Sequence, residues 1–190
     1  MAFTEPIRDK KQLKQLAKYF LQRGQFRNHL LLVIGAHTVL RISDILRLTW
    51  GDVYDEEQGA FYSHITVTEQ KTGKVKTVVL HPVVVKALHL YFPYRRSDFI
   101  FVSNRVIPAA ISRVQAWRIL HAAVEAVGLI GLRIGCHSLR KTLGHWAWKE
   151  GVSPVVIMEI YGHTSYDVTR RYLGIAQEDI DRAYLAATLF

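Results

Sequence analysis

Six side chains, spread over four short segments of this sequence, are of the types needed to break and re-form a phosphodiester bond. Arginine can grip a phosphate with a forked, permanently charged set of donors. Histidine and lysine can move protons near neutral pH or donate to a charged oxygen. A tyrosine hydroxyl can attack phosphorus and hold it covalently. The six candidate catalytic residues are Arg41, Lys71, His137, Arg140, His163 and Tyr172.

The spacing of these residues adds to the signal from their types. His137 precedes Arg140 by three positions, so one face of a helix can present both side chains to the same phosphate. Arg41 follows a strongly apolar segment and lies between Leu40 and Ile42, an unusual place for an idle surface arginine. The pattern therefore predicts a phosphate-binding site assembled from segments that are remote in sequence.

The order and spacing of the four segments resemble the catalytic domain of the tyrosine recombinases, also called the phage integrase family. The resemblance runs from about Ile7 to the C-terminus. It rests on Leu-Arg-Ile-Ser-Asp at 40–44, Gln-Lys-Thr-Gly-Lys at 70–74, His-Ser-Leu-Arg at 137–140, and Gly-His at 162–163 with a tyrosine nine residues after the histidine. Each segment alone is a weak signal, whereas the ordered set is specific.

The resemblance implies a role for each candidate. The two arginines would hold the phosphate oxygens in the five-coordinate transition state, and Tyr172 would be the nucleophile. Lys71, in a turn between two strands, would reach the DNA minor groove and protonate the leaving 5′ oxygen, with Lys74 as the alternative. His137 and His163 stand at the family's spacing and complete the set.

The nucleophile needs help from its neighbours. A free tyrosine has a pKa of about 10, so Tyr172 requires nearby cations to attack at pH 7. Asp44, three residues after Arg41, matches an acidic position of the family that supports the site from behind. A phosphotyrosyl bond keeps the energy of the broken backbone bond, so a second DNA end can reseal it without ATP or a metal. The expected activity is therefore strand exchange rather than nuclease action.

Composition and charge favour a nucleic-acid partner. The formal net charge is +9, from 25 Lys and Arg against 16 Asp and Glu. A basic surface raises the local concentration of polyanions, although a basic protein without such a partner is the alternative. The longest uninterrupted apolar run, residues 30–36, is far shorter than the roughly 20 residues of a membrane-spanning helix. No membrane partner is expected.

Cysteine usage and the N-terminus suggest a compartment. Cys136 is the only cysteine, which excludes an internal disulfide and a cysteine-cluster zinc site. The first residues carry no secretory signal. A zinc site made from His137 and His163 lacks a third ligand at a suitable spacing. We therefore expect no metal and no cofactor, and a cytoplasmic location, in the bacterial nucleoid or in the host cell of a mobile element.

Periodicity predicts a mainly α (α+β) fold, a helical bundle with a small antiparallel sheet at one edge. Asp9 is expected to cap the first helix and Ser43 a later one. The segment 28–40 is apolar on nearly all sides and is expected to form a buried central helix. The expected strands are 61–68 and 75–80, with a third near 53–57. The expected helices are 10–23, 28–40, 83–91, 112–127, 137–149, 153–161, 164–173 and 178–189.

The expected function is site-specific DNA recombination of the integrase or invertase type by one catalytic domain over residues 1–190. Cleavage would leave a 3′-phosphotyrosyl link and a free 5′ hydroxyl. The resemblance implies a tetramer on two specific sites in double-stranded DNA, with accessory DNA-bending proteins as further partners. The C-terminal helix, residues 177–190, would dock on a neighbouring protomer through its apolar stripe of Ile180, Ala183, Tyr184 and Ala187.

One departure from the family and two other functions stay open. Family members usually carry an N-terminal DNA-clamping domain, for which this chain has no room. We expect a naturally minimal member, like the fimbrial switch invertases, rather than a catalytic fragment. A type IB topoisomerase shares the chemistry but acts alone and relaxes supercoils. A non-catalytic DNA-binding regulator would be expected to lack one or more of the catalytic side chains, whereas all six candidates are present here.

Overall fold

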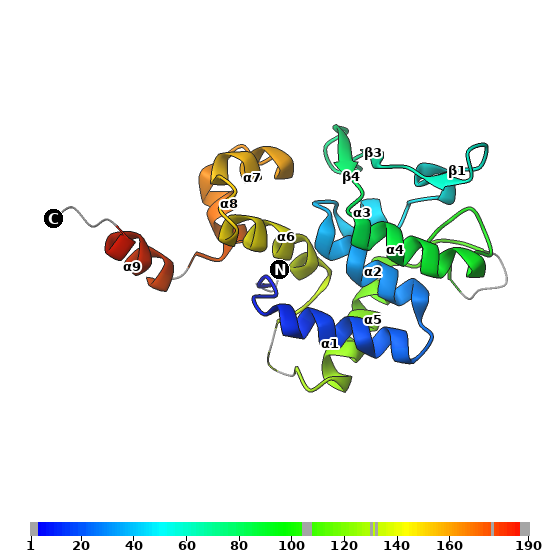
Figure 1. The fold of residues 1–190 in the computed structure, drawn as a ribbon, viewed down its shortest axis with the longest axis horizontal. Helices are drawn as coiled ribbons and strands as arrows, with labels where there is room; N and C mark the ends of the chain where they lie inside the picture. The colour runs from blue at the N-terminus through cyan, green and yellow to red at the C-terminus, as the bar shows by residue number, and fades with distance from the viewer. Residues whose placement is uncertain (1–3, 104–107, 130, 132, 176, 187–190) are drawn as a thin grey trace.

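The computed structural model describes residues 4–103, 108–129, 131, 133–175 and 177–186. The described chain is mostly helical, as the sequence predicts, and its helices gather into two groups with a separate last helix (Figure 1). The α-helices are α1 (Lys10–Gln22), α2 (Phe26–His37), α3 (Ile42–Ile45), α4 (Pro82–Tyr91), α5 (Arg113–Ala126), α6 (Cys136–Lys149), α7 (Pro154–Tyr161), α8 (Tyr166–Leu173) and α9 (Gln177–Ala186). Two short 3-10 helices are η1 (Trp50–Asp52) and η2 (Phe92–Tyr94).

Two of the predicted helix caps can be compared with α1 and α3, and one of them is wrong. Asp9 caps α1 as predicted, because its Oδ1 accepts a hydrogen bond from the Lys11 N–H at 2.7 Å. Ser153 caps α7 in the same way. Ser43 does not cap a helix, which is a wrong prediction. The backbone stays extended through Arg41, so α3 begins at Ile42 and Ser43 lies inside it.

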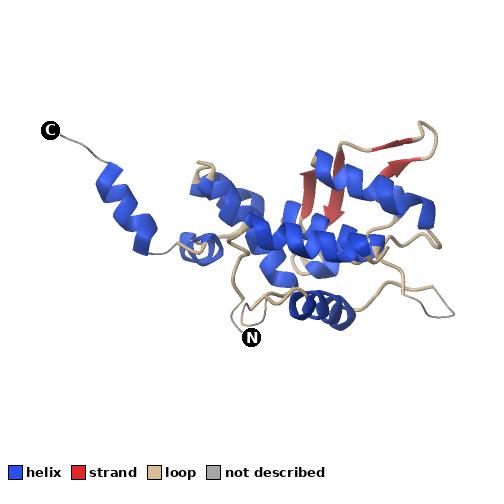
Figure 2. Ribbon diagram, turned by 60° about the horizontal axis from the view of Figure 1, so that its bottom comes forward, coloured by secondary structure: helices blue, strands red, loops and turns tan. Residues whose placement is uncertain are grey.

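The predicted small sheet is divided into two hairpins. β1 (Tyr54–Asp55) pairs with β2 (Ala60–Phe61), and β3 (His64–Thr68) pairs with β4 (Val75–Val79), both antiparallel. The predicted strand 61–68 breaks at residues 62 and 63, where the chain leaves the first hairpin. Figure 2 shows the strands gathered at one end of the helical assembly. The second hairpin leaves residues 69–74 as its connecting loop.

The buried helix α2 sets the position of α6. All seven residues from 30 to 36 are buried, as the continuous apolar run predicts. Helices α4 and α6 pack against α2. A Cβ atom on Gly35 would lie only 2.8 Å from Cδ1 of Leu139, so only glycine permits this approach of the two helices. The core contact thereby fixes the helix that carries His137 and Arg140.

A smaller core holds α7 and α8 against the segment that precedes Arg41. Its buried members are Val39, Ile157, Tyr161 and Leu173, with Tyr172 packed at its edge. The next helix, α9, lies away from both helical groups in the two ribbon views (Figures 1 and 2). None of the helices in the described part of the chain is long and apolar enough to cross a membrane.

Candidate active site

The fold brings five of the six candidate residues together from four separate elements. One lies at the start of α3, two lie in the first two turns of α6, one at the corner between α7 and α8, and one in the last turn of α8. These five residues are Arg41, His137, Arg140, His163 and Tyr172.

The Tyr172 hydroxyl lies at the centre of this cluster. Its oxygen is 2.7 Å from Nε2 of His137. The ring of His163 packs edge-on against that of Tyr172, with the two centroids 4.6 Å apart. The Lys141 ammonium lies 5.3 Å from the centroid of the Tyr172 ring. The phenolic oxygen therefore has a nitrogen base within hydrogen-bonding distance and a cation nearby.

Both histidines are neutral near pH 7 in the DNA-free protein. Burial of its ring, followed by the charges of Lys141, Arg140 and Arg41, lowers the pKa of His137 to about 4. Burial also lowers the pKa of His163 to about 4, with further contributions from neighbouring positive charges. A neutral imidazole with its proton on Nδ1 has a free lone pair on Nε2. His137 can therefore accept the proton of Tyr172.

Arg140 is a buried cation whose guanidinium is fixed by backbone carbonyls. The residue is 2% exposed. Its Nη1 donates to the carbonyl of Val39, and its Nη2 donates to that of Tyr161 at 3.3 Å. Its Nε has no partner in the described part of the chain. Burial and the nearby charge of Arg41 lower the pKa of Arg140, so an anion bound between the two arginines would relieve an unfavourable charge arrangement.

Arg41 and Asp44 connect the start of α3 to the loop of the second hairpin. Arg41 Nη1 lies 2.6 Å from Oε1 of Glu69, in an ion pair at the end of β3. Asp44 is buried, and its Oδ1 accepts a hydrogen bond from the Gln70 N–H at 3.1 Å. Gln70 immediately precedes Lys71. The acidic residue that follows Arg41 by three positions thus anchors the hairpin loop behind the cluster.

Lys71 lies apart from the other five candidates in the DNA-free structure. It is exposed in the loop 69–74, as is its predicted alternative Lys74. Among the described residues, the structure records no contact between Lys71 and the rest of the cluster. Its role therefore stays a prediction, and it requires the lysine stem to reach DNA from the loop.

Sequence reasoning missed two charged residues of this region, Glu69 and Lys76. Both are largely shielded from solvent and pair with each other at 3.2 Å. The alternation of buried and exposed residues along β3 could have identified Glu69. Ile65, Val67 and Glu69 are buried at every second position, so the face of β3 that enters the core ends in a carboxylate.

Three further residues, also missed, contact the candidate residues or their neighbours in the chain. The hydroxyl of the buried Thr169 lies 3.0 Å from Nδ1 of His163. Nδ1 of His145, a histidine to which the sequence pattern assigns no role, lies 2.6 Å from the carbonyl of Leu173, next to Tyr172. The Tyr161 hydroxyl donates to the carbonyl of Arg140 at 2.5 Å. These contacts are between remote segments, and local sequence patterns carry no signal for them.

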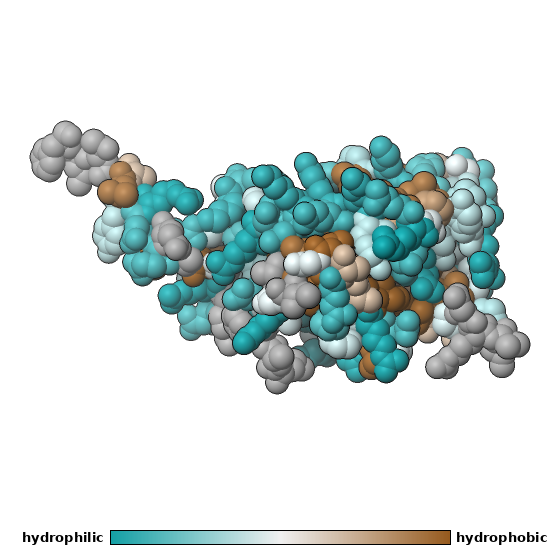
Figure 3. All heavy atoms as spheres, turned by 90° about the horizontal axis from the view of Figure 1, so that it is seen from below, coloured by the Kyte–Doolittle hydropathy of each residue, from teal (hydrophilic) through white to brown (hydrophobic). Residues whose placement is uncertain are grey.

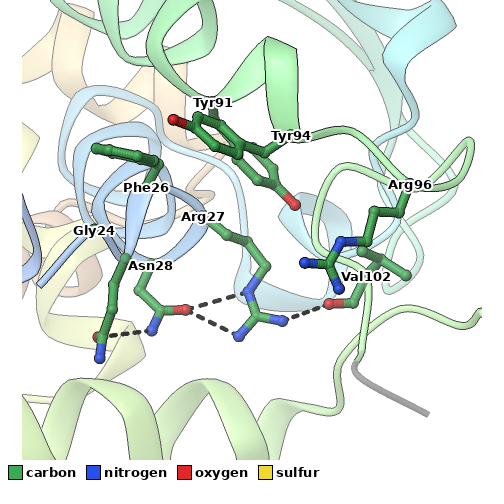
Figure 4. Close-up of a pocket in the computed structure, with 9 residues that line it drawn as sticks. Gly24, Phe26, Arg27, Asn28, Tyr91, Tyr94, Arg96 and Val102 are labelled. Carbon is green, nitrogen blue, oxygen red and sulfur yellow. Dashed lines mark hydrogen bonds between the residues drawn. The ribbon is translucent and has the colours of Figure 1, made fainter.

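A hollow of about 330 Å³ lies elsewhere on the surface, and none of the six candidates lines it (Figure 4). Its most buried cation, Arg27, donates to the Asn28 side chain and to the Val102 carbonyl. These internal bonds assign Arg27 to the packing of this region. Within the described residues, no group of three or more His, Cys, Asp or Glu side chains is placed to hold a metal ion.

Comparison with known proteins agrees with the fold. The chain is 32% identical over 185 residues to the probable integrase/recombinase YoeC of Bacillus subtilis (strain 168), and the match covers 97% of each. It is 25% identical over 181 residues to tyrosine recombinase XerH of Campylobacter jejuni, covering 94% of this chain but 49% of XerH.

Solved structures show the same fold at lower identity. The crystal structure of XerA recombinase matches with a TM-score of 0.77 at 22% identity, covering 98% of this chain and 66% of XerA. A lambda integrase fragment, residues 75–356, bound as a dimer to a COC′ core site, matches with a TM-score of 0.70 at 19% identity. That match covers 91% of this chain and 60% of the fragment.

The fold is the one seen in XerA recombinase and in lambda integrase. The chain belongs to the phage integrase family, whose family model matches residues 8–179. The resemblance read from the four sequence segments is confirmed.

Proposed function

We propose that this chain cuts and rejoins double-stranded DNA at specific sites through a 3′-phosphotyrosyl bond at Tyr172. The observation that carries the proposal is the 2.7 Å approach of the Tyr172 hydroxyl to Nε2 of His137, beside the buried cation Arg140. The phenolic oxygen attacks the scissile phosphorus while its proton passes to His137. The bond from phosphorus to the 5′ oxygen breaks, and Lys71 supplies the proton for the departing oxygen.

The charge of the site fits this reaction. Attack on a phosphodiester places extra negative charge on the phosphate oxygens, and donors oriented in advance toward that charge lower the barrier. Arg41 and Arg140 supply two such guanidinium groups. A bound phosphate would also raise the low pKa of His163, because its negative charge favours the protonated imidazole. His163 can then donate to a phosphate oxygen.

The partners proposed from the sequence are specific sites in double-stranded DNA and further copies of this chain. The solved complexes of XerH with difH DNA and of lambda integrase with a core site support a DNA partner. A tetramer on two DNA sites, accessory DNA-bending proteins and a cytoplasmic location belong to the same proposal. So does a single catalytic domain over residues 1–190.

A nicked suicide substrate tests the proposed reaction. Duplexes made from inverted repeats in the DNA that flanks the gene would trap the covalent step, because the released strand end diffuses away. We expect a protein–DNA adduct on a denaturing gel, formed equally well in excess EDTA, since the two arginine side chains provide the positive charge. Loss of cleavage in EDTA, restored by magnesium, would indicate a nuclease instead.

Assembly on paired sites separates a recombinase from a type IB topoisomerase. Wild-type protein mixed with two labelled duplexes should form a synaptic complex that runs as one species on a native gel. Relaxation of supercoiled DNA without such a complex would favour a type IB topoisomerase.

Helix α9 is the proposed contact between protomers. Tyr184 and Leu185 are 80% and 82% exposed, and Figure 3 shows apolar atoms near the outer end of this segment. Asp179 at its start pairs with Lys149 of α6. Of the predicted apolar stripe, Ala187 and the side chain of Ala183 lie outside the described residues. An exposed tyrosine and leucine on one helix suit burial against another copy of the chain.

Deleting residues 177–190 should weaken assembly on DNA and leave the melting temperature nearly unchanged. The deleted helix contributes none of the buried core residues of the described structure. The measurements are thermal unfolding by circular dichroism and synaptic-complex formation on a native gel. A sharply lowered melting temperature, with normal assembly at a temperature where the protein is folded, would show that the helix packs on its own domain.

A further inference from the structure

A buried carboxylate lies within the otherwise cationic cluster. The Glu69 side chain is 2% exposed, and its Oε1 lies 2.6 Å from Arg41 Nη1 and 3.2 Å from Lys76 Nζ. Its Oε2 accepts a hydrogen bond from the Thr72 hydroxyl at 2.7 Å. We call Arg41, Glu69, Thr72 and Lys76 the Glu69 cluster. The reaction proposed above assigns no part to Glu69 or Lys76.

Lys76 extends the cluster to the corner that carries His163. Its Nζ donates to the backbone carbonyl of Ile160 at 3.0 Å, near the end of α7. The same ammonium lies 3.7 Å from the position that a Cβ atom would take on Gly162, the residue before His163. One ionic network therefore joins the start of α3, the second hairpin and the corner between α7 and α8.

Glu69 keeps its negative charge at neutral pH. Burial by itself raises the pKa of Glu69, but hydrogen bonds from Arg41, Thr72 and Lys76 outweigh burial and hold that pKa at about 2. The pKa of Lys76 is lowered overall, because burial and the charges of Arg140 and Arg41 outweigh the pairing with Glu69. Glu69 is thus an ionised carboxylate in surroundings of net positive charge.

Stability alone does not account for such an arrangement. Removing charged groups from water carries a desolvation penalty that pairing often only offsets, so a buried ion pair is a weak source of stability. An apolar residue at position 69 would continue the core face formed by Ile65 and Val67. A carboxylate in contact with Arg41 is better explained by its effect on the orientation of the Arg41 guanidinium.

We infer that Glu69 is a positioning residue for DNA cleavage. It holds one side of the Arg41 guanidinium, so that the remaining N–H groups of Arg41 are directed to the phosphate. Through the Thr72 hydroxyl it also fixes the loop from which Lys71 reaches the DNA. In the proposed reaction Arg41 holds the phosphate and Lys71 protonates the leaving 5′ oxygen. The Glu69 carboxylate would therefore position both residues.

Lys76 is the second positioning residue, because it locks the corner that presents His163. The inference rests on the proposed cleavage by Tyr172. It predicts a slower cleavage step with unchanged DNA affinity. The opposite role for Glu69 would be a block, in which its carboxylate occupies the place of the phosphate beside Arg41. Neutralising Glu69 would then speed cleavage or tighten DNA binding, so the sign of the effect separates the two roles.

The test is Glu69→Gln in the full chain, which keeps the size of the side chain and removes its charge. Single-turnover cleavage of the nicked substrate is expected to slow by about 10- to 100-fold, the range for losing one charge-assisted hydrogen bond. DNA affinity in a gel-shift titration should not change. Lys76→Gln should slow cleavage similarly, and Lys76→Arg should retain most of the rate. The matched control is Glu57→Gln, an exposed glutamate between β1 and β2, which should cleave at the wild-type rate.

Glu69→Gln protein that cleaves at the wild-type rate, cleaves faster or binds DNA more tightly would overturn the inference. If Glu69→Gln does not fold, as judged by circular dichroism, the two Lys76 variants decide. Equal rates for Lys76→Gln and Lys76→Arg would overturn it, and recovery by arginine alone would support it. If the wild-type chain forms no covalent adduct, the proposed function itself is wrong. If wild type and variants cleave at equal rates, only the positioning role is wrong.

Discussion

Replacing Tyr172 with phenylalanine is expected to abolish the covalent protein–DNA adduct, with a loss of at least about 10⁴-fold in the cleavage rate. The substitution removes the attacking oxygen and leaves the ring, which packs edge-on against His163 and Tyr161. Folding should be affected little, because only the hydrogen bond to His137 is lost, at a cost of about 0.5–1.5 kcal/mol. The measurement is adduct formation on the nicked substrate, with DNA binding followed by gel shift.

Tyr166→Phe is the matched control, since Tyr166 is an exposed tyrosine on the same helix. It should form the adduct at the wild-type rate. Tyr161 is a poor substitute nucleophile, because burial raises the pKa of its hydroxyl, which is also bound to the backbone of Arg140 and Gly144. Any adduct that survives Tyr172→Phe contradicts the assignment, and peptide mapping of the linked residue would identify the true nucleophile.

The elements that carry the site were predictable from local patterns. The unbroken apolar run at 30–36 indicates the buried helix α2, and Asp9 and Ser153 mark helix starts through their capping side chains. Because these signals depend on residues close in sequence, the helices that they mark could be predicted. Helix ends were less accurate. The predicted helix 28–40 is observed as Phe26–His37, because the backbone becomes extended at Thr38 to place Arg41 before α3.

The inner supports of the site were not predictable, because they are contacts between remote segments. His145 reaches the carbonyl of Leu173 across 28 residues, and Lys76 reaches that of Ile160 across 84. Nothing in the sequence next to His145 or Lys76 distinguishes them from other histidines and lysines of the chain. Only the packing of α6 against α8, and of the second hairpin against the end of α7, gives these side chains their partners.

The pKa values of the histidines were also beyond sequence reasoning. An isolated histidine has a pKa of about 6.5, which suggests a proton shuttle that is poised at neutral pH. Burial and the surrounding cations instead hold the pKa of His137 and of His163 at about 4. The two imidazoles of the site are therefore neutral near pH 7. In the proposed reaction, the negative charge of a bound phosphate would raise the pKa of His163 and so couple DNA binding to the protonation of that imidazole.

Substituting Arg140 with lysine should slow cleavage by about 10²- to 10³-fold, the typical effect of losing one donor to transition-state charge. The guanidinium donates to the carbonyls of Val39 and Tyr161, and in the proposed reaction it would also hold the phosphate. A single ammonium group cannot keep both carbonyls and reach the phosphate. The free energy of unfolding should also fall by about 1–3 kcal/mol, because a buried carbonyl loses its donor.

Single-turnover cleavage and urea denaturation of Arg140→Lys measure the two effects separately. The control is Arg23→Lys, an exposed arginine at the end of α1 that lies against Tyr19, which should change neither quantity appreciably. Cleavage is compared at a temperature at which both variants are fully folded, so that lost stability cannot imitate lost catalysis. A wild-type rate in Arg140→Lys would mean that the site uses only the positive charge at this position. The fixed orientation of the guanidinium, for which Val39 and Tyr161 provide the carbonyls, would then have no part in cleavage.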